Sequence, residues 1–515
     1  MLLVSPDKMA AYGVEITFAI RNARFYPSAD GVCIRVFSLD KEMEVIEQVA
    51  ETETIHGQTE PVFKEKLSLN YRFEKLQRFR AIVYVLNSST NTIMGSMGST
   101  DFDLSMMFAC GGRLSLPIIT PLSTISLEIT GKVPEYYSQF LRLRFSGSHI
   151  HSPDGLPLQL YFILSIPSDD RTIMLHKSEM LRETKNPEWA AFSVPLFLLN
   201  YFNESSIQVH VYNYTPNHDD SLVGHCTTTL TQLQQGVGHF NSYMLMEPSG
   251  KRIHEKTCVE LKELKLENGP TFFQMLENNV KLQLTSAIDL TASNGNPVNP
   301  SSLHYIHPHQ PSAYLESLLL TTPPLLGYLP NPQNPYIGAL GFGAKVQGPT
   351  GLQLSHCFCL NGAPSDPRVE GLAGLISAYR QATMGLQPFA PTDFSEVIYF
   401  VSKFAKAESR RHVGLYFVLL IYSDGGPANA LNMKRTIDAL VDASAHPMSI
   451  VAVGVGQDRD RSPMRNLEKL TLKHSDGRLL VRQNYTYVES SELENSDALA
   501  MIPVQMAQWK RMFHS

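Results

Sequence analysis

The stretch VKLQLTSAIDLTAS (280–293) gives the clearest indication of fold in this 515-residue sequence. It begins as an apolar strand and ends in a polar loop that carries Asp289, Thr291 and Ser293. Further apolar strands are expected at YIGALGFGA (336–344), VGLYFVLLIYSDG (413–425) and MSIVAVGVG (448–456). Helical patterns lie between and after them, at residues 370–382, 393–409, 432–444 and 502–513. This alternation predicts an α/β doubly wound, mostly parallel sheet with helices on both faces.

Oxygen-bearing side chains follow the ends of two of these strands and open one helix. Asp289, Thr291 and Ser293 end the first strand, Asp424 in YSDGG ends another, and Thr392 in FAPTDF precedes a helix. Ligands of open parallel sheets bind beyond the carboxyl ends of the strands, where these pieces should meet. Two carboxylates and three hydroxyls suit Mg²⁺, Mn²⁺ or Ca²⁺ better than zinc. Because so few charged ligands leave the ion under-neutralised, we expect it to attract an acidic residue of a partner.

The first 260 residues show a different pattern. Short segments of alternating polarity are separated by polar turns, which predicts antiparallel β-sandwiches. The clearest segments are VEITFAI (14–20), VCIRVFSL (32–39), RAIVYVL (80–86), LRLRF (141–145) and IQVHVYNY (207–214). Two stretches repeat the same order of turn, proline, aromatic residue, strand and glycine; the matching pairs are Pro61 and Pro187, Phe63 and Trp189, and Gly95 and Gly224. We therefore predict two similar sandwiches.

Composition excludes several classes of protein. The 43 basic and 49 acidic residues leave a net charge of −6, which argues against nucleic acid as a partner. The six cysteines form no C-x-x-C pair, so we expect no zinc ribbon, RING or disulfide framework. The longest apolar stretch, GLYFVLLIY (414–422), is far shorter than the ~20 residues that a membrane helix needs. Without a signal-peptide pattern at the start, we expect a cytoplasmic protein.

The set D-x-[ST]-x-S, then Thr, then S-D-G resembles the metal-ion-dependent adhesion site (MIDAS) of von Willebrand factor type A domains. The segments AIDLTASNGNP (287–297), SSLHYI (301–306), ALGFGAK (339–345), FAPTDFSEVI (389–398) and PMSIVAVGVG (447–456) resemble the copine type of this domain. The resemblance implies that Thr291, Ser293 and Thr392 touch Mg²⁺ or Mn²⁺ directly. It also implies that Asp289 and Asp424 act mostly through water.

Copines carry two C2 domains followed by one A-like domain. The resemblance therefore implies a C2-like β-sandwich at 1–133, a second one at 134–255, and a copine-type A-like domain at 256–515 with a linker at 256–270. It also implies a peripheral membrane adaptor that binds anionic phospholipid through the C2-like domains and can be recruited to the plasma membrane. The A-like domain would bind a protein partner that presents an acidic residue.

The sequence departs from the family in the loops where C2 domains hold Ca²⁺ with several aspartates. Asp30, Asp154, Asp219 and Asp220 lie near expected positions, but Val85, Asn87, Asn213 and Thr215 stand where aspartates are expected. Losing charged oxygens should weaken Ca²⁺ binding severely, so Ca²⁺ binding by the C2-like domains stays open. A basic strand face carrying His176, Lys177, Arg182 and Lys185 offers binding to anionic lipid by charge alone, with a solvated polar face as the alternative.

Other functions stay open beside the adaptor. A protein–protein scaffold without lipid binding and an adaptor associated with a ubiquitin ligase are the alternatives. We expect no enzyme, because the sequence has no nucleophile elbow, Walker loop, kinase motif set or H-E-x-x-H. We interpret His304, His307 and His309 as part of a polar loop rather than a metal tract, and Gly341 and Gly343 lack the spacing of a dinucleotide-binding loop.

Overall fold

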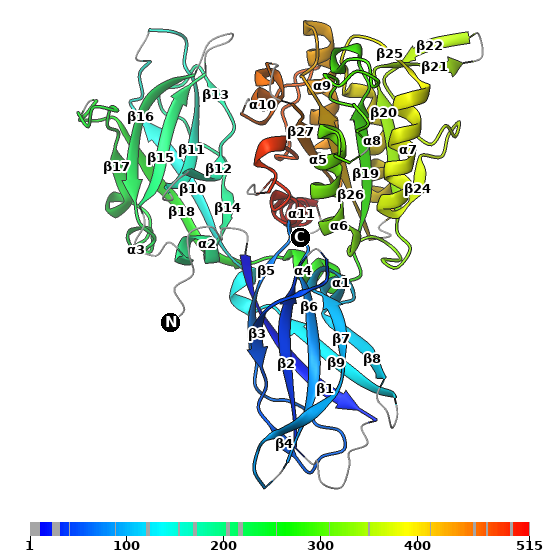
Figure 1. Cartoon of the computed structure of the whole chain (residues 1–515). Helices are drawn as coiled ribbons and strands as arrows, with labels where there is room; N and C mark the ends of the chain where they lie inside the picture. Colours follow the sequence, from blue (N-terminus) through cyan, green and yellow to red (C-terminus); the bar gives the residue numbers. More distant parts are fainter. Residues whose placement is uncertain are drawn as a thin grey trace. The chain divides into compact units, whose positions relative to one another are not determined.

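The computed structural model describes residues 11–22, 31–40, 42–87, 89–119, 124–152, 155–167, 172–201, 206–214, 220–253, 255–307, 309–348, 351–411, 414–456, 460–469, 472–494 and 498–513 (Figure 1). The chain divides into two compact units. One comprises Glu135–Pro270, and the other joins Ala10–Pro134 to Thr271–Ser515. Among the described residues no helix is both long and apolar enough to cross a membrane.

The first sandwich consists of two antiparallel sheets, in the orders β5-β1-β9-β8 and β3-β2-β6-β7, with β4 paired to β2. Inward-facing residues alternate with outward-facing ones along β9, as expected for a strand that covers a core. Its elements are β1 (Ala11–Arg21), β2 (Gly31–Leu39), β3 (Val45–Glu51), β4 (Ile55–His56), β5 (Leu67–Arg72), β6 (Arg78–Leu86), β7 (Ile93–Asp103), α1 (Leu104–Ala109), β8 (Arg113–Ile119) and β9 (Thr124–Lys132).

The second sandwich repeats this plan, with sheets in the orders β14-β10-β18-β17 and β12-β11-β15-β16, and β13 paired to β11. Its elements are β10 (Gln139–Ser148), β11 (Gln159–Pro167), β12 (Thr172–Lys177), β13 (Leu181–Arg182), β14 (Phe192–Pro195), α2 (Leu196–Tyr201), β15 (Ile207–Asn213), β16 (Ser221–Thr228), α3 (Leu230–Leu233), β17 (Ser242–Met244) and β18 (Cys258–Asn268). The prediction of two antiparallel sandwiches is confirmed.

The proline–aromatic repeat has the same structural role in both sandwiches. The buried rings of Phe63 and Trp189 are each 1% exposed. The Phe63 amide donates to the carbonyl of Phe18 (3.0 Å), and the Trp189 amide donates to that of Phe145 (3.2 Å). In each case the turn is thereby bound to the first strand of its sandwich, and the aromatic ring enters the core. The repeat seen in the sequence is thus a repeat of structure.

One expectation about domain organisation is corrected. The predicted linker at 256–270 contains strand β18, which pairs with β10 over its whole length and with β17 at its start. Its alternation is masked in the sequence by charged residues that form ion pairs across the sheet, such as Arg142 with Glu263 (2.8 Å). The strand completes the second sandwich, and we propose that the boundary with the A-like domain lies at Pro270.

The A-like domain is built on a sheet in the order β23-β20-β19-β26-β27-β28. Strands β20, β19, β26, β27 and β28 run parallel, whereas the short β23 and β24 pair antiparallel with β20. The bounds are β19 (Lys281–Asp289), β20 (Tyr336–Phe342), β23 (Phe358–Cys359), β24 (Arg368–Glu370), β26 (Leu415–Ser423), β27 (Met448–Gly454) and β28 (Tyr485–Glu489). The predicted mostly parallel α/β sheet is confirmed.

Helices cover both faces of this sheet (Figure 1). On one face α8, α9 and α10 pack against apolar side chains of β19, β20, β26 and β27. The other face is covered by α4, α5, α6, α7 and α11. The bounds are α4 (Phe272–Glu277), α5 (Ala313–Thr321), α6 (Pro323–Leu326), α7 (Gly371–Gly385), α8 (Ser395–Arg411), α9 (Ala430–Ala443), α10 (Ser462–Lys469) and α11 (Met501–Phe513). A small antiparallel sheet of β21 (Ala344–Gly348), β22 (Gly351–Ser355) and β25 (Gln387–Pro388) lies beside them.

The first sandwich and the A-like domain share an aromatic core. Helix α4 begins with Phe272 and Phe273, and the Phe273 ring makes edge contacts with Tyr12 and Tyr71, at centroid distances of 5.0 and 5.3 Å. The hydroxyls of Tyr71 and Tyr328 are hydrogen-bonded to each other. These buried contacts explain why the two segments, far apart in the sequence, form one compact unit.

Candidate metal site

The five predicted ligand residues lie at the carboxyl edge of the parallel sheet. Strands β19 and β26 are parallel neighbours with Ile288 opposite Tyr422, so Asp289 and Asp424 end adjacent strands at the same edge. Both carboxylates are buried, at 0% and 1% exposure. Asp289 accepts hydrogen bonds from the Thr291 amide (2.8 Å) and from the Ser423 hydroxyl. The strand register alone thus brings two acidic side chains together.

Electrostatics make this pair of carboxylates costly without a counter-charge. Burial raises the pKa of Asp289 to about 7, with the neighbouring charge of Asp424 as the second contribution. Desolvation and like charge both penalise the ionised form. A divalent cation would remove this penalty, because it supplies the opposite charge that the two carboxylates lack.

A chain of hydroxyls connects the first loop to Asp424. The Ser293 hydroxyl donates to Asp424 Oδ1 (3.0 Å), and the Thr291 and Ser293 hydroxyls lie 2.7 Å apart. Since Ser293 uses its only proton on Asp424, Thr291 donates to Ser293. The structure therefore brings four of the predicted residues into one hydrogen-bonded group.

Thr392 lies in a loop that is bound to both other parts of the site. Its backbone carbonyl accepts from the Ala428 amide (3.1 Å) and from Asn432 Nδ2 (3.0 Å), just after Asp424 in the sequence. Earlier in the same loop, the Phe389 carbonyl accepts from the Ala292 amide (3.0 Å). The backbone thus places Thr392 at the same sheet edge, with its side chain outside the hydrogen-bonded group of four.

Among the described residues, no group of three or more His, Cys, Asp or Glu side chains could hold a metal ion. The site at the sheet edge has only two carboxylates, so a cation there would depend on the hydroxyls of Thr291, Ser293 and Thr392. Oxygen-only ligands of this kind fit Mg²⁺ or Mn²⁺. The residues present therefore fit the predicted ion.

His304 is a positioning residue that sequence reasoning assigned to a polar loop. Its Nε2 lies 2.8 Å from the Asp289 carbonyl oxygen and its Nδ1 lies 2.9 Å from the Tyr379 hydroxyl. Since a carbonyl only accepts, Nε2 carries the proton and Nδ1 accepts from Tyr379. Burial lowers the pKa of His304 to about 4, so the ring is neutral. The histidine holds the end of β19 in place, whereas His307 and His309 lie in the loop as expected.

Gly343 allows the end of β20 to approach the site. Its φ is +76°, and a Cβ at this position would lie 2.2 Å from Thr291 Cγ2. Only glycine satisfies both the left-handed backbone and the close contact. The GFG pattern, which has no dinucleotide-binding spacing, therefore has a steric role beside the metal loop.

The C2-like loops depart from Ca²⁺ sites in the way the sequence indicated. Asn213 is fully buried, and its Oδ1 accepts from the Gln159 amide (2.7 Å), so the side chain stabilises the sandwich. Asn87 Oδ1 accepts from the Ser89 amide (2.9 Å) within its own loop. Asp220 accepts from the Tyr161 hydroxyl (2.7 Å). The other loop positions considered, Asp30, Asp154, Thr215 and Asp219, lie outside the described residues.

The predicted basic face of the second sandwich is smaller than expected. His176 and Lys177 are neighbours on β12, so their side chains point to opposite faces. The His176 ring stacks on Phe192 at 3.7 Å, and burial lowers its pKa to about 3. His176 therefore belongs to the inner face, which corrects the prediction. Lys177 lies on the outer face with its Nζ 4.6 Å from the centre of the Tyr161 ring.

Comparison with protein-family models gives the class of each domain. The C2 domain model matches residues 36–109 and 153–245, and the Copine model matches residues 302–515. Two C2 domains followed by one Copine domain is the order found in copines. The chain belongs to the copine family.

Solved structures similar to the chain contain C2 domains. The structure named BON1-C2B is 16% identical, covers 25% of this chain and 93% of its own, and has a TM-score of 0.22. The calcium-bound pair of C2 domains of Extended-Synaptotagmin 2 is 13% identical over 50% of this chain and 98% of its own, with a TM-score of 0.19. Human GIVD cytosolic phospholipase A2 is 14% identical over 51% of this chain and 33% of its own, with a TM-score of 0.18.

Proposed function

We propose that the chain is a non-enzymatic peripheral adaptor whose A-like domain binds a protein partner through a divalent metal ion. The observation that carries this proposal is the group formed by Asp289, Thr291, Ser293 and Asp424, in which two buried carboxylates meet at a sheet edge. Mg²⁺ or Mn²⁺ at this edge would lend its positive charge to an acidic side chain of the partner. Thr392 would supply a further hydroxyl ligand.

The chain's own residues would act in defined ways. Asp289 and Asp424 would provide the negative charge that holds the cation, and Thr291 and Ser293 would turn their hydroxyl oxygens toward it. Uncharged hydroxyl ligands leave part of the ion's charge available to an incoming carboxylate. His304 would keep Asp289 in position through the backbone carbonyl that it already binds.

The metal site predicts a cation-dependent change in stability. MgCl₂ or MnCl₂ should raise the melting temperature of the wild-type chain, because a ligand that binds only the native state stabilises it by mass action. Asp424→Ala and Asp289→Ala should abolish most of this rise and also abolish partner binding. A thermal-shift titration with each salt measures the effect.

A matched control removes an exposed carboxylate of the same domain. Asp366 forms a surface ion pair with Arg368 (2.7 Å) and lies away from the predicted ligands in the sequence. Asp366→Ala should keep the full metal response. Equal shifts in wild type and Asp424→Ala would mean that the cation does not bind at this edge.

We also propose that the C2-like domains bring the chain from the cytoplasm to anionic membranes such as the inner face of the plasma membrane. The supporting observation is that Lys177 and Arg182 pair with Ile163 and Gln159 of β11, two residues on the same side of that strand. Burial lowers the pKa of Lys177 to about 8, which leaves it mostly protonated at neutral pH. Missing loop aspartates argue that charge, rather than Ca²⁺, provides the attraction.

Membrane binding should therefore respond strongly to salt and weakly to Ca²⁺. At about 1 kcal/mol per basic side chain near an anionic surface, removing Lys177 and Arg182 together should weaken binding by roughly tenfold or more. Sedimentation with phosphatidylserine-containing vesicles measures this at low and raised NaCl, with and without Ca²⁺.

The control for this experiment removes the same charge from the other sheet. Arg142 and Lys262 are held by Glu263 and Glu260, so Arg142→Ala with Lys262→Ala should have little effect on vesicle binding. Tight binding that requires micromolar Ca²⁺ and survives raised salt would refute binding by charge alone. Vesicle binding that no condition produces would favour the scaffold without lipid binding.

A further inference from the structure

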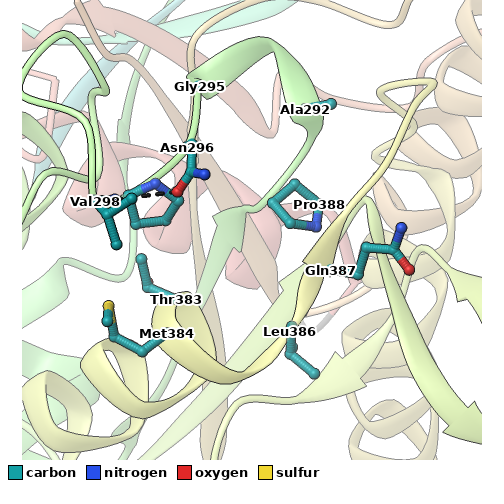
Figure 2. A pocket seen from close by; sticks show the side chains of 10 residues that line it. Ala292, Gly295, Asn296, Val298, Thr383, Met384, Leu386, Gln387 and Pro388 are labelled. Atoms are coloured by element: carbon teal, nitrogen blue, oxygen red, sulfur yellow. Dashed lines mark hydrogen bonds between the residues drawn. The ribbon is translucent and has the colours of Figure 1, made fainter.

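An open depression of about 440 Å³ lies beside the candidate metal site (Figure 2). It is formed by the loop after β19 on one side and by the end of α7 with β25 on the other. Its lining residues are Ala292, Gly295, Asn296, Pro297, Val298, Thr383, Met384, Leu386, Gln387 and Pro388. None of these residues carries a charge, and most of them are apolar.

The depression and the metal site share a loop. Ala292 lines the depression and stands between Thr291 and Ser293, two of the predicted metal ligands. On the opposite side, Pro388 precedes Phe389, whose carbonyl accepts from the Ala292 amide (3.0 Å). A ligand held at the metal site would therefore pass within reach of this depression.

The walls of the depression are ordered by local hydrogen bonds. The Val298 amide donates to Asn296 Oδ1 (3.2 Å), as Figure 2 shows, and the Leu386 amide donates to the Ala382 carbonyl (3.0 Å). Thr383 Oγ1 donates to the Tyr379 carbonyl (2.8 Å). The shape is thus already formed, so a ligand would not need to order it.

Large apolar side chains are exposed here, although burial would stabilise them. Val298 is 66% exposed and Met384 is 59% exposed. Phe389, next to Pro388, is 40% exposed and carries the Lys345 ammonium 4.4 Å from its ring centre. The surface therefore combines an apolar hollow with a nearby positive charge, which complements a ligand that is both acidic and apolar.

We propose that this depression receives a large aliphatic or aromatic side chain that neighbours the acidic residue by which a protein partner binds the metal site. The inference rests on the proposed function and specifies its partner: a segment with Asp or Glu close to Leu, Ile, Met or Phe. The acidic residue would provide metal dependence, and the apolar residue would provide selectivity among acidic segments.

The experiment selects ligands without assuming a partner. The immobilised full-length chain is exposed to a random displayed peptide library in MgCl₂, and bound peptides are eluted with EDTA. We expect the eluted peptides to contain an acidic residue with a large apolar residue within a few positions. Replacing that apolar residue with alanine in a selected synthetic peptide should weaken binding by about tenfold, the effect of burying one such side chain.

Two variants test the location. Met384→Glu places a charge in the depression and should remove the preference for apolar residues, while EDTA-eluted peptides remain acidic. Met512→Glu introduces the same charge at a methionine on α11 that is 51% exposed, and it should select the same peptides as wild type. The metal-induced rise in melting temperature of each variant verifies that the metal site has folded.

The outcomes separate this inference from the function on which it rests. Acidic peptides without an apolar preference, or an apolar preference that Met384→Glu leaves intact, would refute the inference and leave metal-dependent binding standing. Eluted peptides without acidic residues, or no EDTA-eluted peptides at all, would refute the proposed function and the inference with it. Apolar peptides that bind equally in EDTA would mean that the depression acts without the metal site, which also refutes it.

Discussion

Phe273→Ala should destabilise the unit that contains the first sandwich and the A-like domain by about 3–5 kcal/mol, the usual cost of truncating a buried phenylalanine. Phe273 is 4% exposed and lies among the rings of Tyr12, Tyr71 and Phe108, with centroid distances of 5.0, 5.3 and 4.9 Å. Edge-to-face contacts of this kind contribute beyond the buried area. Because the ring joins the two segments of the unit, its loss should weaken both. Urea unfolding followed by circular dichroism measures the change.

The control for this prediction is a phenylalanine of the same domain that lies at the surface. Phe404 on α8 is 50% exposed, so Phe404→Ala should change the free energy of unfolding by about 0.5 kcal/mol or less. If Phe273→Ala cost no more than Phe404→Ala, the aromatic core between the first sandwich and the A-like domain would not exist as described. A large loss confined to Phe273→Ala would support it.

The parallel sheet could be predicted because its strands are almost purely apolar. Every residue of β27 is buried, and eight of the nine residues of β26 are buried, so composition alone indicates them. Four of the five predicted metal residues form one hydrogen-bonded group because their spacing follows strand ends, which a parallel sheet must align. Local patterns thus sufficed wherever the determining contacts were local or followed from strand order.

Other features depended on contacts that no local pattern reveals. Strand β18 has a conspicuously charged outer face, and its alternation makes sense only once Glu263 is seen beside Arg142 of β10. His304 stands 15 positions after Asp289, and the loop between them returns the ring to the Asp289 carbonyl. Had the proline–aromatic repeat been extended to the last strand, β9 would have predicted β18. For His304 the sequence offered no comparable signal.

Gly343→Ala should abolish the metal-dependent rise in melting temperature while also destabilising the A-like domain by about 2 kcal/mol or more. Two costs combine at this position. The backbone has φ +76°, which disfavours any residue with a Cβ, and that Cβ would lie 2.2 Å from Thr291 Cγ2 and 3.2 Å from the Thr291 nitrogen. Relief of the clash must move Thr291, and with it the hydroxyl chain through Ser293 to Asp424.

A second glycine separates these two costs. Gly362 has φ +72°, nearly the same backbone conformation, but its Cβ would meet nothing within 4 Å. Gly362→Ala should therefore cost only the conformational term, about 1 kcal/mol, and should keep the full response to MgCl₂. Thermal-shift titrations of both variants beside wild type measure this difference. If Gly343→Ala kept the full metal response, the cation would not depend on the position of Thr291, and the ligand set proposed at this sheet edge would be wrong.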